Sequence, residues 1–238
     1  MENYRLEGKT FVIDDYDRLP AFSSFLPGLA GVKGIPMWTF YTNRGQGMNS
    51  FGIDNKGNAI MEFNSANTAF ENTTVKGFRT FLKIDGEYYE PFFKYEKEAK
   101  RQIRMNKNSF KIIETNEKYG IEVTVNYFIL PNESIGALVR QVSVKNISDS
   151  AKDIEVIDGL PKIITYGISN GEFKEMSNLF KSWAYIKNID NKVPYYTLRA
   201  STKDSAEVSD VEGGYYYLTI KDGELQDVIY DVDTVFGY

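Results

Sequence analysis

Three polar side chains with planar hydrogen-bonding groups lie close together in the stretch "WTFYTNRGQGMNSFG". Asn43, Arg44 and Gln46 carry two carboxamides and a guanidinium, which suit the recognition of hydroxyl, carboxylate or phosphate groups. Gly45 and Gly47 flank Gln46 and permit a tight turn with positive φ, so the stretch predicts a hairpin loop. We expect Arg44 and Gln46 to project from the tip of this loop, with Asn43 beside them.

Aromatic residues lie on the strand that leads into the loop. Trp38, Phe40 and Tyr41 could offer a flat apolar face to a pyranose ring, so a sugar site would combine this strand with the loop. The competing interpretation is that Trp38 and Phe40, which point to one side of the strand, pack into the core. Arg44 would then simply pair with a carboxylate.

Other polar groups are weaker candidates. "KGFRTFLKI" places Arg79 on an alternating strand. "MEFNSANTAF" supplies Glu62, Asn64, Asn67 and Thr68, a set that ordinary Asx turns explain. The candidate contacts to a substrate or an interface are therefore Trp38, Asn43, Arg44, Gln46 and Arg79.

Acidic residues are plentiful, but their spacing defines no catalytic pair. Asp14, Asp15 and Asp17 form a local acidic turn, and Asp231 and Asp233 alternate near the end of the chain. Glycoside hydrolysis needs two carboxyl groups about 5 to 10 Å apart across the substrate, and sequence spacing does not establish that geometry. No catalytic residue is therefore assigned.

The composition excludes several kinds of chemistry. The 238 residues include no Cys and no His, so disulfides, thiolate catalysis, His-dependent triads and histidine-ligated metals cannot occur within the chain. The net charge of −5 does not favour binding to nucleic acid. No run approaches the roughly 18 apolar residues of a membrane span, and the charged start lacks a signal peptide. We expect a cytoplasmic protein without nucleic-acid or membrane partners.

The elements that would position the candidate residues are mostly strands. "YGIEVTVNYFIL" alternates apolar and polar residues and predicts a half-buried strand over 121–129. Hairpins are predicted around Asn116–Gly120 and Asn146–Ser150. Arg140 shares a strand face with apolar residues, and the favoured interpretation is that it lies at a strand end and extends its charge to solvent. Further strands are expected at 11–13, 37–42, 48–53, 59–63, 78–84, 101–105, 195–200 and 215–220. About a dozen short strands with regular turn signals predict a mainly β fold, a large antiparallel β-sandwich.

One segment departs from the strand pattern. In "NGEFKEMSNLFKSWAYIKNI", Phe173, Met176, Phe180 and Trp183 recur at helical spacing, which predicts one amphipathic helix near 172–188 with these residues in the core. No linker and no internal repeat divides the chain, so one domain over 1–238 is predicted. The apolar ending "LQDVIYDVDTVFGY" is unlike the polar termini of most domains and indicates a fragment.

The segment from Phe22 to Ile84 resembles a known family. "FSSFLPGLAGVKGIPMWTFYTNRGQGMNSFGIDNKGNAIMEFNSANTAF", followed by "GFRTFLKI", is similar to the N-terminal part of glycoside hydrolase family 94, formerly glycosyltransferase family 36. Family members are inverting glycoside phosphorylases, and the similarity is greatest to the 1,2-β-oligoglucan phosphorylase and cellobiose phosphorylase type. "VSVKNISDSAKDIEVIDGLPKIITYG" and the helical segment ending in Trp183 extend the resemblance from about Phe11 to Phe236.

The resemblance implies a fold and an activity. Family members carry an N-terminal β-sandwich of the galactose-mutarotase-like supersandwich type, a helical linker, a catalytic (α/α)6 barrel and a small C-terminal β domain. This chain would be the sandwich of a larger phosphorylase, inactive without the barrel that holds the catalytic acid. In the parent reaction, inorganic phosphate attacks a β-glucosidic bond with inversion and releases α-glucose 1-phosphate. No metal or organic cofactor is implied.

The resemblance also implies partners. These are a β-glucan oligosaccharide and inorganic phosphate, bound through the parent enzyme, the absent barrel, and a second copy if the enzyme is a homodimer. The glycine-rich loops would then reach the rim of the active site. Two alternatives stay open: a stand-alone carbohydrate-binding module with exposed aromatic residues, and a purely structural or dimerisation domain with the same residues buried at an interface.

Overall fold

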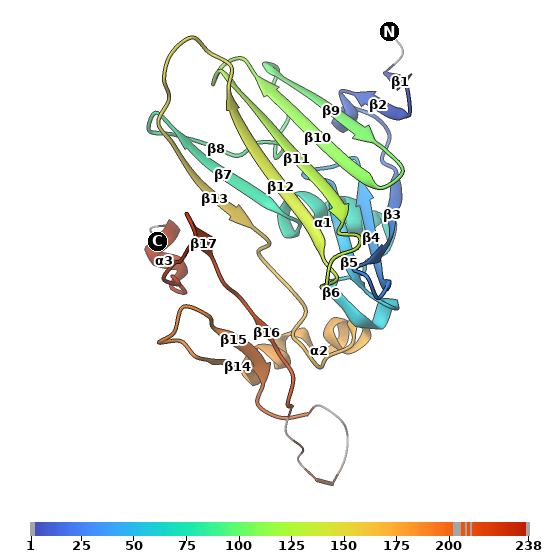
Figure 1. The fold of residues 1–238 in the computed structure, drawn as a ribbon, viewed down its shortest axis with the longest axis vertical. Coiled ribbons are helices and arrows are strands. Elements are labelled where there is room, and N and C mark those ends of the chain that lie inside the picture. The colour runs from blue at the N-terminus through green and yellow to red at the C-terminus, as the bar shows by residue number, and fades with distance from the viewer. Residues whose placement is uncertain (1–2, 202–205, 208, 210, 237–238) are drawn as a thin grey trace. The chain divides into compact units, whose positions relative to one another are not determined.

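The computed structural model describes residues 3–201, 206–207, 209 and 211–236, and it shows a mainly β protein with several antiparallel sheets (Figure 1). The chain divides into two compact units, Met1–Ile163 and Ile164–Tyr238. The prediction of a single domain over 1–238 stays a prediction. No helix in the described part of the chain is both long and apolar enough to cross a membrane.

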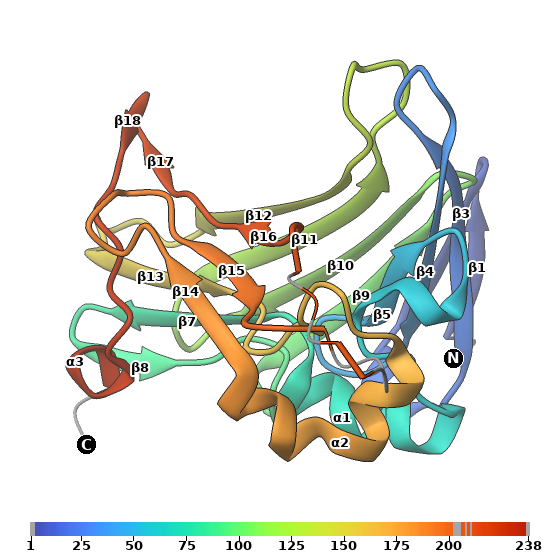
Figure 2. The ribbon, with the colours of Figure 1, turned by 90° about the horizontal axis from the view of Figure 1, so that it is seen from below.

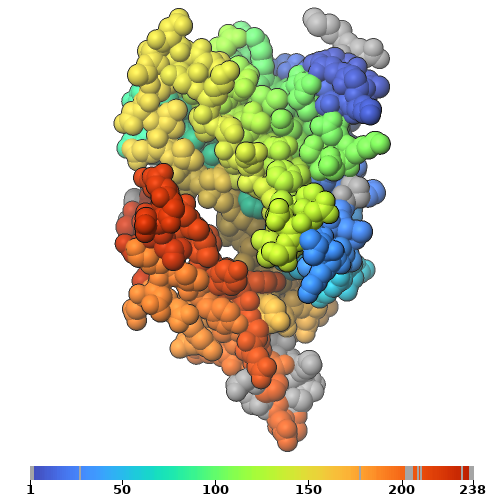
Figure 3. Space-filling view, viewed as in Figure 1, coloured from blue at the N-terminus to red at the C-terminus, as the bar shows by residue number. Residues whose placement is uncertain are grey.

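The largest sheet of the first unit has six antiparallel strands. Their order is β1 (Tyr4–Glu7), β2 (Thr10–Asp14), β9 (Ala99–Met105), β10 (Ser109–Asn116), β11 (Ile121–Ile129) and β12 (Leu138–Asn146). The predicted hairpin of β10 and β11 is confirmed. The alternation predicted over 121–129 is confirmed as well, because every second side chain of β11 is buried. The green and yellow residues of β10 to β12 form part of the first unit's surface in Figure 3.

Two smaller sheets complete the first unit. One has the order β3 (Ser23–Ala30), β4 (Ile35–Thr42), β5 (Met48–Ile53) and β6 (Ala59–Met61), and the other has the order β13 (Ile154–Gly159), β7 (Arg79–Ile84) and β8 (Glu87–Tyr89). Short 3-10 turns lie at Tyr16–Arg18 and Lys56–Asn58. The strands predicted at 11–13, 37–42, 48–53, 78–84 and 101–105 are therefore present, and the one predicted at 59–63 is shorter.

Side chains from all three sheets meet in one apolar core. Tyr41 of β4 stacks on Phe110 of β10 with ring centroids 4.1 Å apart. Phe51 of β5 stacks on Phe78, which directly precedes β7, at 6.2 Å. Fully burying a side chain of this size stabilises the fold by about 1.5 to 3 kcal/mol, so contacts of this kind fix how the sheets face one another.

The hairpin predicted around Asn146–Ser150 is wrong. The turn is present, because the Asn146 side chain accepts from the Ser148 amide and donates to the Ser150 carbonyl. The strand after it, β13, pairs with β7 instead of β12. Two hydrogen bonds between Asp85 and Asp153 hold β13 beside β7. The Asp85 carboxylate accepts from the Asp153 amide at 2.9 Å, and the Asp85 amide donates to the Asp153 carbonyl.

The helix α1 (Ala66–Lys76) is absent from the sequence prediction, which expected one helix only. Its sequence, ANTAFENTTVK, has no apolar stripe and is rich in Asn and Thr, which are weak helix formers. Packing holds it in place, since Ala69 and Thr73 are buried and a Cβ on Gly45 would lie 3.0 Å from the Cα of Thr74. Figure 2 places α1 on the opposite side of the first unit from β12.

The second unit begins with α2 (Asn170–Trp183), so the helix predicted near 172–188 ends earlier. Phe173 and Phe180 are buried as predicted, but the backbone kinks at Met176 (φ −125°, ψ 23°), whose side chain is exposed, and Trp183 is half-buried. The remaining elements are β14 (Ala184–Lys187), β15 (Tyr195–Leu198), β16 (Tyr215–Tyr216), β17 (Ile220–Lys221), β18 (Glu224–Leu225) and α3 (Val232–Phe236). The strand predicted at 195–200 is shorter, and the one at 215–220 is broken in two.

Candidate functional site

Asn43 begins the predicted ligand-binding loop and is fully buried. Its Oδ1 accepts from the Phe22 amide at 2.9 Å, and its Nδ2 donates to the carbonyls of Tyr16 at 2.9 Å and Pro20 at 3.1 Å. The carboxamide therefore satisfies three backbone groups of the segment that precedes β3. Its hydrogen-bonding capacity is used inside the chain.

Arg44 does not project from the loop, so the expectation that it would is wrong. Its side chain is half-buried and folds back, with Nη1 donating to the Asn43 carbonyl at 2.7 Å and Nη2 to the Leu19 carbonyl at 3.0 Å. Its partners are carbonyls, whereas the competing sequence interpretation expected a carboxylate. The guanidinium braces the same segment that Asn43 holds.

Gln46 lies at the turn of the loop and is also buried, 4% exposed. The loop turns inward because Gly47 has a φ of +82° and lies against the ring of Phe110, where an added Cβ would come within 2.3 Å of a ring carbon. The expectation that Gln46 projects from the tip of the loop is therefore wrong, and the glycines do not present a tip to solvent. They instead allow the backbone to approach the core closely.

Gln46 belongs to a largely buried polar network, with Asp158 at its exposed end, that the sequence analysis did not identify. Arg140 donates to the Gln46 Oε1, to the Asp158 carboxylate, to the Thr80 hydroxyl at 3.2 Å and to the Tyr127 hydroxyl at 3.2 Å. Gln46 Nε2 donates to Thr80 Oγ1 at 3.0 Å, and Thr80 donates to Asp158 at 2.5 Å. These residues come from the loop, β7, β11, β12 and β13, so the network ties the three sheets together.

The charges in this network are fixed by burial and pairing. The Arg140 side chain is only 8% exposed, so the interpretation that it extends its charge to solvent is wrong. Burial alone would lower the pKa of Arg140, but Tyr127 and Asp158 outweigh it and the pKa is raised. Burial raises the pKa of Tyr127 to about 12, partly offset by Arg140. The guanidinium therefore stays charged and the phenol stays neutral at physiological pH.

Arg79 is engaged as well. Its Nε and Nη2 donate to the two carboxylate oxygens of Glu90 at 2.7 and 2.8 Å, and its guanidinium lies over the rings of Phe81 and Phe93. The hydrogen bond that Arg79 donates to Glu90 is the main reason that the pKa of Arg79 is raised. A bidentate pair of this kind leaves little capacity for a ligand carboxylate or phosphate.

The aromatic residues of β4 behave differently from the polar loop. Trp38 and Phe40 are half-buried and stay outside the core, on the outward face of the β3–β6 sheet, so the competing core interpretation is wrong for both. They form a cluster with Phe25 and Phe63, in which neighbouring ring centroids are 5.4 to 6.4 Å apart. We call these four residues the aromatic face. Trp38 lies across Gly52 of β5, where a Cβ would come within 2.5 Å of the indole.

The sugar site expected from the sequence is thus split. Tyr41 points into the core and stacks on Phe110, whereas Trp38 and Phe40 point outward. The indole Nε1 of Trp38 donates to the Asn55 carbonyl at 3.0 Å, which fixes the ring in place. The aromatic half of the prediction lies at an accessible surface, and the polar half lies inside.

The acidic residues are paired or serve in turns. Asp14 accepts from Arg5 and from Gln102, and Asp17 accepts from the buried Arg101. Asp15 has a φ of +46° and begins a 3-10 turn. In the second unit, the carboxylate of Asp231 accepts from the backbone amide of Asp233 and from the hydroxyl of Thr234, at the start of α3. Within the described ranges, no group of three or more acidic residues is arranged to hold a metal ion.

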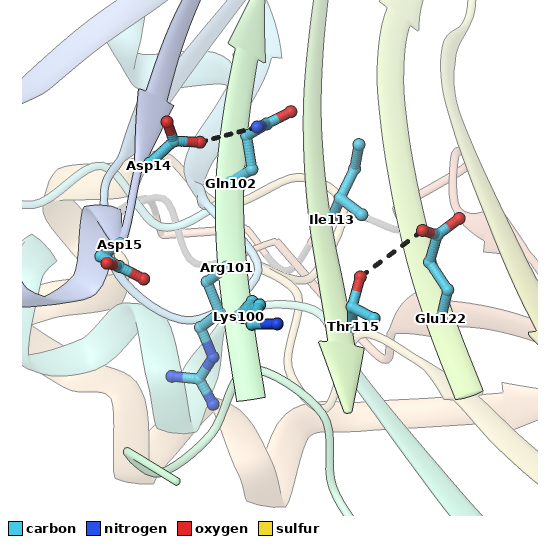
Figure 4. Close-up of a pocket in the computed structure, with 8 residues that line it drawn as sticks. All are labelled: Asp14, Asp15, Lys100, Arg101, Gln102, Ile113, Thr115 and Glu122. Atoms are coloured by element: carbon cyan, nitrogen blue, oxygen red, sulfur yellow. Dashed lines mark hydrogen bonds between the residues drawn. The ribbon is translucent and has the colours of Figure 1, made fainter. Parts of the chain in front are cut away.

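A shallow hollow of about 480 Å³ lies over the outward face of the six-stranded sheet (Figure 4). Its lining comes from β2, β9, β10, β11 and the turn after β2: Asp14, Asp15, Lys100, Arg101, Gln102, Ile113, Thr115 and Glu122. The dashed contacts in Figure 4 join Asp14 to Gln102 at 2.7 Å and Thr115 to Glu122 at 3.5 Å. Its charges are mixed and partly paired with one another, so it does not define a binding site.

No protein-family model matches this sequence, and no curated protein matches it in sequence. The resemblance of Phe22–Ile84 to glycoside hydrolase family 94 therefore stays a prediction. Function is argued below from that resemblance and from the geometry of the described residues.

Proposed function

We propose that this chain is the β domain of an inverting glycoside phosphorylase that acts on β-glucans. In the parent enzyme, phosphate would cleave a β-glucosidic bond and release α-glucose 1-phosphate, with the catalytic residues in a barrel outside this chain. The proposal for the fold is a galactose-mutarotase-like β-sandwich. The core shared by the six-stranded and four-stranded sheets supports it.

The observation that carries the carbohydrate proposal is the aromatic face. Its four rings lie on an outward sheet surface, and Phe25 is 60% exposed. Aromatic rings held at fixed positions offer flat apolar surfaces to the C–H faces of sugar rings without losing much conformational freedom on binding. All four residues fall within Phe22–Ile84, the segment whose sequence resembles the phosphorylase family.

The polar loop has a different part in this proposal. Asn43, Arg44 and Gln46 form hydrogen bonds within the chain, so they stabilise the hairpin that carries the aromatic face. Arg79 likewise holds the segment around Glu90. These residues act as supports, and a glucan chain contacts the rings of Trp38 and Phe40.

A stand-alone carbohydrate-binding module is the second candidate, because it too requires accessible aromatic residues. The two candidates predict different effects of substitutions in the full-length protein. Loss of the aromatic face would impair phosphorolysis of a glucan by a phosphorylase, whereas a module would bind glucan without any coupled reaction.

Calorimetric titration of the 238-residue chain with β-1,2-glucooligosaccharides, and separately with phosphate, tests the proposal. We expect saccharide binding that Trp38→Ala weakens at least tenfold and Arg44→Ala leaves unchanged. Phosphate alone should give no heat of binding. A folded wild-type chain that binds no saccharide would overturn the role of the aromatic face and leave the domain as a support only.

A further inference from the structure

A second, smaller hollow lies beside the aromatic face, between the four-stranded sheet and the first turn of α1. Its volume is about 210 Å³, below the roughly 300 to 1,000 Å³ of pockets for drug-sized ligands. Phe40 and Phe63 form part of its wall, and Ser23, Asn49 and Asn64 supply polar groups. The hollow is therefore of a size for one small molecule with an apolar face.

Asn49 enters this hollow because of a β-bulge. β4 and β5 pair Phe40 with Ser50 and Tyr41 with Met48, so Asn49 is the extra residue between them. A bulge re-aims a side chain out of the regular alternation, and bulges are frequent beside binding sites. Asn49 is consequently a wall residue of the hollow although it is 6% exposed.

The carboxamide of Asn49 is only half satisfied. Its Oδ1 accepts from the Ser50 hydroxyl at 3.0 Å, but its buried Nδ2 has no hydrogen-bond partner among the described residues. Buried polar groups are almost always paired, because leaving a donor unpaired costs free energy. A ligand that accepts a hydrogen bond at this point would remove that cost.

The start of α1 adds further donors to the same place. The N-cap residue Ser65 makes no side-chain hydrogen bond to the helix backbone, so the first-turn amides keep their capacity. Ser65 and Ala66 both line the hollow. The donors available here are the Nδ2 of Asn49 and the first-turn amides of α1, and no cationic side chain is among the lining residues.

We propose that this hollow binds one neutral pyranose ring. A ring hydroxyl accepts from Nδ2 of Asn49, and the apolar face of the sugar lies against Phe40 and Phe63. An oxyanion fits less well, because two phenyl rings line the site and no Lys or Arg does. The choice of a sugar among small neutral ligands rests on the proposed carbohydrate function, whereas the position of the site rests on Asn49 and the hollow alone.

Protein-observed NMR titration with methyl β-D-glucopyranoside tests this site directly. We expect saturable shifts of the Asn49 side-chain amide and of the backbone amides of residues 63–69. A folded chain without saturable shifts there, or with shifts only elsewhere, would overturn the proposal. Titration with inorganic phosphate is the second arm. If phosphate shifted these signals and the glucoside did not, the site would bind an anion and the proposal would be wrong.

Two variants of Asn49 separate binding from folding. Asn49→Leu removes the unpaired donor and also the acceptor of the Ser50 hydroxyl. We therefore expect glucoside binding to fall at least tenfold while the midpoint of thermal unfolding changes little, because these two effects on stability offset each other. A purely structural Asn49 would instead lower that midpoint, and this would count against the site. If Asn49→Leu does not fold, Asn49→Ala is the smaller replacement that removes the same donor, with the same loss of binding expected. Asn67→Ala, an exposed position of α1 outside the hollow, is the matched control and should bind normally.

The outcomes also separate this site from the proposed function. If glucooligosaccharides bind through Trp38 but the Asn49 signals do not move, the single-ring site fails and the proposed function stands. If the glucoside shifts Asn49 but oligosaccharides do not bind through Trp38, the single-ring site stands and the aromatic face loses its role.

Discussion

The two parts of the hairpin made by β4 and β5 direct their polar and aromatic side chains in opposite ways. The loop at its tip turns Asn43 and Gln46 inward, where they hydrogen-bond to the chain's own backbone and side chains. The body of the hairpin turns Trp38 and Phe40 outward, onto an accessible face. The polar side chains beside the glycines of the loop are therefore buried, whereas the aromatic rings on the regular strand are accessible.

The difference follows from backbone geometry. Strand alternation decides the direction of Trp38 and Phe40, because their neighbours Thr39 and Tyr41 already fill the core side. In the loop, alternation stops, and Gly47 brings the backbone against Phe110. Buried carbonyls then need partners, and the nearest donors are the side chains of the loop. If this account is right, changes in the loop network should cost stability, and changes on the aromatic face should cost mainly binding.

The largest effect is expected from Arg140→Ala. Removing this guanidinium leaves Asp158, Gln46 and Thr80 without their shared donor, so the free energy of unfolding should fall by about 3 kcal/mol. Denaturant unfolding followed by circular dichroism measures it. Lys100→Ala, which removes an exposed pair with Glu117, is the control and should change it by about 0 to 1 kcal/mol. Equal effects for the two variants would contradict the view of the network as a structural tie.

Alkaline pH should destabilise the fold around the same network, because it places a negative charge on the buried Tyr127. The folded-state pKa of Tyr127 is about 12, against about 10 in an unfolded chain, so the folded state holds this proton more tightly. Its contribution is intact below pH 10 and is lost between pH 10 and 12, a decrease of about 3 kcal/mol for two pKa units. Burial also raises the pKa of Tyr16 and Tyr89, so they add to the decrease.

Denaturant unfolding at a series of pH values measures this decrease. Tyr127→Phe should make the fall above pH 10 shallower than in the wild type, because the titrating group is gone. A fall of unchanged steepness in that variant would show that Tyr127 is not one of the responsible groups.

Asn43→Ala should have a smaller effect, a loss of about 2 kcal/mol in the free energy of unfolding. The variant leaves the Phe22 amide and the carbonyls of Tyr16 and Pro20 without their partner. Thermal or denaturant unfolding measures the loss. Asn67→Ala on the exposed side of α1 removes the same group and should cost less than about 0.5 kcal/mol.

The smallest effect on stability is expected from Trp38→Ala, about 1 kcal/mol, because the ring is only half-buried. Its saccharide affinity, by contrast, should fall at least tenfold. Measuring both properties for Trp38→Ala and Asn43→Ala completes the comparison. If Trp38→Ala destabilised the chain as strongly as Arg140→Ala, the aromatic face would be part of the core and the contrast between the two regions would fail.

The sequence predicted the elements that depend on local patterns. The alternation in β11 and the β10–β11 hairpin were found because each is encoded within about ten residues. α1 was missed because ANTAFENTTVK carries no apolar stripe, and its helical form depends on packing against Gly45 and on the buried Ala69 and Thr73. The partner of β13 was missed because Asp85 and Asp153, which guide it to β7, are distant in sequence.

The sequence indicated which residue types belong to the candidate site, but not the direction in which their side chains point. Arg140 stands on a strand among apolar residues, and that pattern alone cannot distinguish a buried side chain that pairs with Asp158 from a side chain that extends to solvent. Asn49 gave no signal in the sequence, because a bulge between Met48 and Ser50 is set by cross-strand register. Both positions depend on contacts between segments far apart along the chain.

The Arg140 network also has a consequence for the order of folding. Arg140 lies 94 residues from Gln46 and 60 from Thr80, so the network cannot close until loops of this length have closed. We therefore expect this network to form after the rate-limiting barrier of folding, and local hairpins such as β10–β11 to form before it. Substitutions in the network should therefore accelerate unfolding and leave the folding rate nearly unchanged. The five residues of the network would then set the unfolding rate, and with it the lifetime of the native state.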